Sequence, residues 1–187
     1  PTEAIEREIV TAYGEGTVTL FERFDREPVA AASLGQVHRA RWQGREVAVK
    51  VLRPGVEALV EADLLAARRI LGWIARHWDN VHVRGTRAVI EEFSDRVHEE
   101  MDFRLEAEHG AEIRRNFEKN DRVHVPEVMH DLTRRRVLCM EFIDGVGLER
   151  VIASAGRLPL ERAAAIGAQI ADALDFAHKH GVVHRDI

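Results

Sequence analysis

Residues 28–52 read PVAAASLGQVHRARWQGREVAVKVL, and this stretch holds the two features that decide the fold. The first is a run of small side chains that leads from Ala30 to Gly35 and ends at Val37. The second is Lys50, which lies thirteen positions after Val37 among apolar, strand-forming residues. A loop of small residues lets phosphates approach backbone N–H groups, and a lysine supplies positive charge for phosphate oxygens. The pairing therefore indicates nucleotide phosphate chemistry.

The residue type at position 50 strengthens this interpretation. Of the 27 Lys and Arg residues in the chain, only Lys50, Lys119 and Lys179 are lysines. A lysine inside an apolar strand of such an arginine-rich chain indicates that a compact ammonium is required there, because a planar guanidinium does not act as a point charge. Its neighbours Val49 and Val51 are apolar, as expected where the lysine alone points into a cleft.

Composition excludes several functional classes. A chain of 187 residues, 45% apolar and 32% charged, can bury a core in one domain or in two small lobes. The net charge of -5, with both signs interspersed, argues against nucleic acid as the main partner. The single cysteine, Cys139, precludes an internal disulfide and is expected to be a buried, inert thiol in a reducing, cytoplasmic setting. No stretch approaches the ~20 apolar residues of a membrane span, and the start carries no signal-peptide pattern.

Hydrophobic periodicity predicts an α+β chain whose sheet region leads into a mainly helical one. The predicted helices are Thr2–Tyr13, Glu57–His77, Arg87–Phe117 and Leu160–His180, the last closed by Gly181. The predicted strands are Val37–Trp42, Glu46–Leu52, Val123–Leu132 and Arg136–Glu141, with a hairpin turn at Gln43–Gly44 and a linker around Gly145 and Gly147. The predicted domains are a helical lead-in over 1–28, a sheet lobe over 29–142 and the start of a helical lobe over 143–187.

The small-residue loop aligns with the kinase pattern G-x-G-x-x-G-x-V when Val37 is taken as its last position. The three glycine positions then fall on Ala30, Ala32 and Gly35, so two of them are alanine. The extra methyl groups stiffen the loop, and nucleotide selectivity or turnover should differ from that of a glycine loop. Taken alone, the loop also fits simple tight packing. The predicted nucleotide contacts of this region are Ala30, Ala31, Ala32, Ser33, Gly35 and Val37.

A buried lysine requires a carboxylate that keeps it charged and aims it at phosphate oxygens. The segment EEMDFRLEA at 99–107 supplies several candidates on a predicted helix. A solvated acidic helix face has the same composition, and position alone does not decide between these two interpretations.

Four segments in order together resemble the UbiB/ADCK family of atypical kinases. They read PVAAASLGQVHRA at 28–40, VAVKVLRPGV at 47–56, EMDFRLEAE at 100–108 and VLCMEFIDG at 137–145. The likeness runs from about Pro1 to Val146. It implies a protein-kinase-like fold, ATP with Mg²⁺, and a role in ubiquinone or other isoprenoid lipid metabolism. A lipid or peripheral membrane partner would accompany that role.

The resemblance also assigns roles to residues. It implies that Lys50 is the phosphate lysine, that Glu106 is its helix partner, and that Glu100 and Asp102 form an acidic E-x-D motif. The adenine would lie near Ala48 and Met140, with the backbone from Glu141 to Ile143 as the hinge. The K-x-G-Q motif of the family is not found in the sequence.

The last residues resemble a different group of kinases. His184-Arg185-Asp186 is similar to the catalytic loop of bacterial serine/threonine kinases, in which Asp186 would orient or accept the proton of an attacking hydroxyl. His184 and Arg185 would brace that loop. The metal-binding Asn and the D-F-G aspartate do not occur up to Ile187, so Mg²⁺ ligands are expected downstream and not within this chain.

Three functions therefore remain open at the level of sequence. The first is an ATP-dependent atypical kinase or ATPase, and this 187-residue piece alone is then expected to be inactive. The second is an ordinary serine/threonine protein kinase, favoured by His184-Arg185-Asp186. The third is a pseudokinase or nucleotide-sensing module. An Asn and a D-F-G motif after Ile187 would indicate catalysis, and their absence would indicate the third function.

Overall fold

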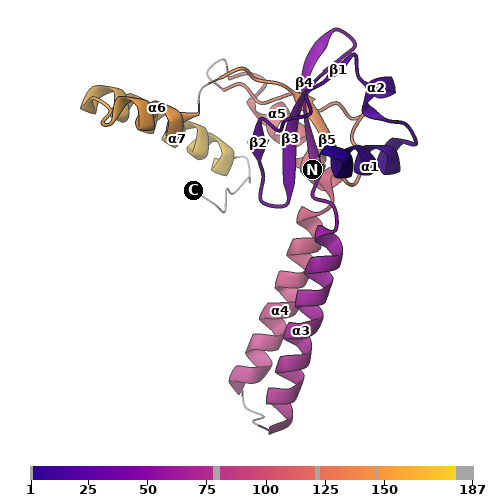
Figure 1. Cartoon of the computed structure of the whole chain (residues 1–187). Coiled ribbons are helices and arrows are strands. Elements are labelled where there is room, and N and C mark those ends of the chain that lie inside the picture. Colours follow the sequence, from indigo (N-terminus) through magenta and orange to yellow (C-terminus); the bar gives the residue numbers. More distant parts are fainter. Residues whose placement is uncertain (1, 78–80, 121–122, 146, 180–187) are drawn as a thin grey trace. The chain divides into compact units, whose positions relative to one another are not determined.

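A computed structural model of the chain describes residues 2–77, 81–120, 123–145 and 147–179 (Figure 1). The chain divides into two compact units. The first unit is Pro1–Glu108 with Val128–Glu141, and the second is His109–Glu127 with Phe142–Ile187. The division into lobes at residue 142, predicted from the sequence, remains a prediction about the domains.

An antiparallel sheet forms the centre of the first unit. In the described part of this unit it has five strands in the order β1-β3-β4-β5, with β2 also paired to β3. The strands are β1 (Arg23–Phe24), β2 (Ala30–Ala31), β3 (Gly35–Trp42), β4 (Arg45–Leu52) and β5 (Val137–Glu141).

The hairpin of β3 and β4 sets the register of the sheet. Its two-residue turn has positive φ at both positions, 49° at Gln43 and 75° at Gly44. Such a turn matches the right-handed twist of the two strands. It places Lys50 opposite Val37 on one side, and β5 places Leu138 opposite Lys50 on the other. The predicted hairpin at Gln43–Gly44 is confirmed.

Alternate residues of β4 point to opposite faces of the sheet. On one face Val47, Val49 and Val51 are fully buried. They pack in one apolar cluster with Ile5 and Ile9 of helix α1 (Thr2–Tyr13). The sequence analysis predicted this helix, and the structure confirms it. The short helix α2 (Thr17–Leu20) follows α1. This face is therefore filled by apolar packing.

Cys139 lies in the same cluster and is fully buried, as predicted. Burial raises the pKa of its thiol to about 12, because the thiolate would lose its hydration. The thiol is accordingly unreactive in the folded chain.

The opposite face of the sheet carries a second cluster. Leu52 and Leu138 of the sheet pack there against Met101, Phe103 and Ala107. Phe103 and Ala107 belong to α5 (Phe103–Phe117), whose apolar positions one turn apart face the sheet. Lys50 projects from this same face, because it alternates with the buried valines of β4.

Helices α3 (Val56–His77) and α4 (Val81–Glu100) come between β4 and α5 in the chain and lie side by side as an antiparallel pair (Figure 1). Polar contacts join them. Arg68 donates to Glu91 at 2.9 Å and to Ser94 at 3.1 Å, and His98 Nε2 lies 2.6 Å from Glu61 Oε1. Large apolar side chains are exposed on the two helices, namely Leu59, Leu65, Ile70, Trp73, Val89 and Phe93.

The described part of the second unit combines helices with irregular segments. It contains the last turns of α5, α6 (Leu148–Ala155) and α7 (Leu160–Lys179). The Phe117 and Phe176 rings contact each other at 4.4 Å between centroids. The predicted helix from Leu160 is confirmed as α7.

The single helix predicted over Arg87–Phe117 is wrong, because the structure breaks it at Met101 and Asp102. The Asp102 carboxylate accepts a hydrogen bond from the Arg104 backbone N–H at 3.1 Å, which is the geometry of a helix N-cap. The apolar spacing continues across the break and therefore concealed it.

The strand predicted over Val123–Leu132 is also wrong. The described part of this segment contributes one isolated bridge, from Val128 to Met140. Pro126 has no N–H to donate to a ladder, and the Val125 carbonyl accepts a hydrogen bond from Arg114 instead. The predicted linker around Gly145 and Gly147 is followed by the short helix α6 (Leu148–Ala155), which the sequence analysis did not predict and which is capped at its C-terminus by Gly156 with φ of 70°. Among the described residues, no helix combines the length and the apolar character needed to cross a bilayer.

Candidate functional site

Lys50 occupies the position that its sequence context predicts. It lies near the end of β4, its side chain is 19% exposed, and it shares its sheet face with Ala48 and Leu52. Its flanking valines point into the opposite cluster and fix the strand. The ammonium therefore lies on the face of the sheet opposite the buried valines, where it is partly exposed.

Glu106 of α5 pairs with Lys50. The Lys50 Nζ atom lies 2.8 Å from Glu106 Oε1 and 2.7 Å from Oε2. The predicted ion pair is therefore present, although Glu106 lies in a different helix from the one in which the sequence analysis placed it. The glutamate side chain is 46% exposed, so water has access to one side of the pair. The catalytic role of these two residues remains a prediction.

Phe103 contacts the same ammonium. The Lys50 Nζ lies 4.7 Å from the centroid of the Phe103 ring, within the range of a cation–π interaction. Phe103 is 1% exposed and precedes Glu106 by one helical turn. Sequence reasoning missed this residue. The available signal was an aromatic residue placed three positions before the glutamate, on the same helix face.

The small-residue loop forms the hairpin between β2 and β3. Ala30 and Ala31 pair with Val37 and Gln36, and the Ala32 N–H donates to the Gly35 carbonyl at 3.1 Å. Ala30, Ala31 and Ser33 are exposed. The structure brings this loop to β3, the strand that pairs with the strand of Lys50, and the role of the loop in phosphate binding remains a prediction.

Position 35 has no room for a side chain, so only glycine fits there without a steric clash. A Cβ atom added there would lie 2.7 Å from the Val51 carbonyl oxygen and 3.6 Å from Cζ of Phe103. The first distance is a clash with backbone, so the end of the loop can approach β4 this closely only because residue 35 has no side chain. The first two glycine positions of the kinase pattern tolerate alanine in this chain, and the third does not.

The two acidic residues of the E-x-D motif fall at the break between α4 and α5. Glu100 is the exposed last residue of α4. Asp102 caps α5 and accepts from Arg104 Nε at 2.9 Å and from Nη2 at 2.5 Å. These hydrogen bonds to the guanidinium hold the pKa of the Asp102 carboxyl below its usual value. Asp102 therefore fixes the start of the helix that carries Glu106.

The predicted adenine contacts lie partly on the same sheet face. Met140 pairs directly with Ala48, two residues from the pairing of Leu138 with Lys50, and both side chains are half-buried. Glu141 ends β5 and is also half-buried. Ile143 is exposed and belongs to the second unit. His184, Arg185 and Asp186 lie outside the described residues.

Metal ligands do not gather in the described part of the chain. No group of three or more His, Cys, Asp or Glu side chains there has the arrangement of a metal site. The described site can thus contribute a positive charge, a carboxylate and a loop of small residues.

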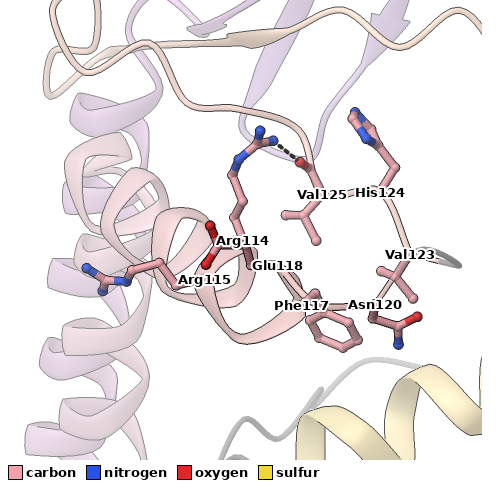
Figure 2. Close-up of a pocket in the computed structure, with 8 residues that line it drawn as sticks. All are labelled: Arg114, Arg115, Phe117, Glu118, Asn120, Val123, His124 and Val125. Carbon is pink, nitrogen blue, oxygen red and sulfur yellow. Dashed lines mark hydrogen bonds between the residues drawn. The ribbon is translucent and has the colours of Figure 1, made fainter.

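A separate pocket lies within the second unit (Figure 2). It has a volume of about 290 Å³ and contains none of the predicted site residues. Arg114 donates to the Val125 carbonyl at its rim, 2.5 Å from the oxygen. Its lining residues are Arg114, Arg115, Phe117, Glu118, Asn120, Val123, His124 and Val125.

Comparison with known proteins identifies the family of the chain. The family model of the ABC1 atypical kinase-like domain matches residues 1–187. The chain is similar to Rv3197 of Mycobacterium tuberculosis, solved in complex with erythromycin, with a TM-score of 0.70 and 33% identity. That match covers 82% of this chain and 38% of the Rv3197 chain, so the chain spans well under half of that protein.

A second solved structure is the PknI kinase domain of Mycobacterium tuberculosis. It matches with a TM-score of 0.42 and 21% identity, over 90% of this chain and 52% of that chain.

Proposed function

The chain belongs to the ABC1 atypical kinase-like domain family, and we propose from this premise that it binds ATP and acts as an ATP-dependent phosphotransferase or ATPase. The observation that carries the proposal is the ion pair of Lys50 and Glu106, with 2.7 and 2.8 Å between the nitrogen and the carboxylate oxygens. In protein kinases a strand lysine paired with a helix glutamate is part of the assembled site.

Lys50 has the donors that this role requires. An ammonium has three N–H groups, and Glu106 accepts at most two of them through its two oxygens. One N–H is then left for a phosphate oxygen of the nucleotide. Glu106 keeps the amine charged and limits its orientation, so the charge is preorganised before the nucleotide arrives.

The loop and the sheet edge would hold the rest of the nucleotide. Exposed backbone around Ala30 to Ser33 would face the phosphates, and the Ala48 and Met140 positions would contact the adenine. Mg²⁺ would supply charge neutralisation of the phosphates when bound. The alanine methyl groups narrow the approach to the loop, and we expect turnover or nucleotide preference to differ from that of a glycine-loop kinase.

The resemblance to UbiB/ADCK kinases supports a more specific role. We extend the proposal to a function linked to ubiquinone or other isoprenoid lipid metabolism, with a lipid or the membrane surface as partner. The assay for this part is lipid-stimulated ATP hydrolysis, with vesicles that contain an isoprenoid quinone compared with vesicles that lack it. Equal rates with both vesicles would remove the lipid role and leave the ATP proposal intact.

A serine/threonine protein kinase is the second candidate, favoured by the sequence His184-Arg185-Asp186. The two candidates differ in the fate of the γ-phosphate. A protein kinase transfers it to a hydroxyl of a protein or peptide, so radiolabel from ATP would appear on a generic peptide substrate. Label released only as inorganic phosphate would favour the ATPase.

The decisive test of nucleotide binding is substitution of Lys50. In protein that extends beyond Ile187 through the expected Asn and D-F-G segment, we expect Lys50→Ala to lower ATP turnover roughly a hundredfold or more, because a preorganised charge at the phosphates is lost. The matched control is Lys119→Ala, which removes an exposed lysine outside the site. Binding of a fluorescent ATP analogue should weaken in the first variant and not in the second. Near wild-type turnover and binding by a folded Lys50→Ala protein would contradict the proposal.

A further inference from the structure

We propose that Phe103 is a positioning residue for Lys50, holding its ammonium against Glu106 and coupling it to the alanine loop. The placement of Lys50 is inferred from contacts alone, whereas the consequence for ATP rests on the proposed function. Three observations support the inference, namely the anchoring of Phe103, its contact with Lys50 and its contact with the base of the loop.

Phe103 is rigidly held. Its side chain is 1% exposed and packs with Leu52, Met101 and Leu138. Its backbone N–H donates to the Arg135 carbonyl at 2.9 Å, which ties the first residue of α5 to the segment before β5. The ring therefore cannot move unless this part of the core opens.

Lys50 needs such a rigid contact. A lysine ammonium ends a flexible four-carbon stem, and a carboxylate that is 46% exposed restrains it only weakly. The Phe103 ring lies 4.7 Å from Nζ and contributes an electrostatic attraction together with a fixed wall. Phe103 and Glu106 lie one turn apart on α5, so a single helix face presents both contacts to the ammonium.

The same ring reaches the base of the loop. Its Cζ atom lies 3.6 Å from the place that a Cβ of Gly35 would occupy, and Leu34 packs against the cluster that contains Phe103. The loop, the lysine and helix α5 thus meet at one aromatic ring. A shift of α5 would move the support of the loop and the support of Lys50 together.

The first test measures the placement of Lys50 without nucleotide. Because the chain has only three lysines, trace acetylation with acetic anhydride followed by mass spectrometry reports each one separately. In Phe103→Leu we expect acetylation of Lys50, relative to the exposed Lys119, to rise about threefold to tenfold, since a cation–π contact and a rigid wall are lost. Phe21→Leu is the matched control, because Phe21 is buried in the other cluster.

The outcome that overturns the inference is an unchanged Lys50 rate in a folded Phe103→Leu protein. An equal rise in Phe21→Leu would also overturn it, because general loosening would then be the cause. If Phe103→Leu does not fold, Phe103→Met fills a similar volume with a flexible, non-aromatic chain and is expected to give the same rise.

A second measurement separates this inference from the proposed function. Saturating Mg-ATP should protect Lys50 from acetylation in the wild-type protein, and lack of protection would contradict nucleotide binding at this site. The rise in Phe103→Leu without nucleotide would still support the positioning role. If ATP protects Lys50 equally well in both proteins and the rates without nucleotide also agree, the proposed function stands and the positioning role is refuted.

Discussion

Replacing Glu106 by glutamine separates the function of the ion pair from its contribution to folding. At 2.7 Å, Coulomb's law gives about 1.5 kcal/mol for the pair in water-like surroundings. The ordering of two side chains offsets part of this, and exposed pairs contribute roughly 0–1 kcal/mol to stability. Since Glu106 is 46% exposed, we expect Glu106→Gln to lower the free energy of unfolding by less than about 1 kcal/mol.

The effect on ATP turnover should be much larger. The neutral amide can still accept one hydrogen bond, but it no longer holds the ammonium through a charged, two-oxygen contact. A misplaced Lys50 loses its interaction with charge that develops at the phosphates, and we expect turnover to fall roughly a hundredfold, or about 2.7 kcal/mol of barrier.

The assay pairs urea denaturation with steady-state ATP hydrolysis by protein that extends beyond Ile187 through the expected Asn and D-F-G segment, for the wild type, Glu106→Gln and the control Glu108→Gln. Glu108 lies two residues further along α5 and is exposed. The reasoning fails if Glu106→Gln hydrolyses ATP within about threefold of the wild type. It also fails if the loss of stability reaches several kcal/mol, because the pair would then be a structural element.

Three further predictions follow from the fold. Gly35→Ala should lower the free energy of unfolding by about 1–3 kcal/mol, because the added Cβ would lie 2.7 Å from a backbone oxygen. The control Gly72→Ala has open space around it in α3 and should raise the free energy of unfolding by up to about 1 kcal/mol. Urea denaturation measures both changes. Asp102→Ala should cost about 1 kcal/mol through the lost cap of α5, and Asp102→Asn should restore most of it; thermal unfolding of the two variants checks this. The hydrogen bond to the Glu61 carboxylate raises the pKa of His98 above its usual value of 6.5, so the stabilisation by this pair is lost as pH rises through the folded-state pKa. The stability difference between wild type and His98→Gln, measured by urea denaturation, should therefore shrink as the pH is raised above 6.5.

The sequence was most informative where local pattern and chemistry coincide. The alternation around Lys50 predicted its strand and its face. The resemblance of four ordered motifs to atypical kinases predicted the family, which the match of the ABC1 domain confirms. The pairing with Glu106 was predicted from family position, and the structure contains it.

The remaining features depend on tertiary context that periodicity does not record. The apolar spacing from Ile90 to Leu105 continues through the break at Asp102, whereas the capping hydrogen bond of Asp102 marks the start of α5. The segment 123–132 has strand-like composition, but Pro126 and the Arg114 contact to Val125 leave it outside the sheet. Strands β1 and β2 contain two residues each, which is too short for an alternating pattern.

The two-residue turn at Gln43 and Gly44 has a consequence for the folding reaction itself. A slip of one residue between β3 and β4 would exchange the faces of β4 and carry Lys50 into the cluster where Val49 is now fully buried. An unpaired ammonium in that apolar layer would cost several kcal/mol. Lys50 therefore also penalises the misregistered sheet, so the charge that we propose binds phosphate would also disfavour incorrect strand pairing during folding.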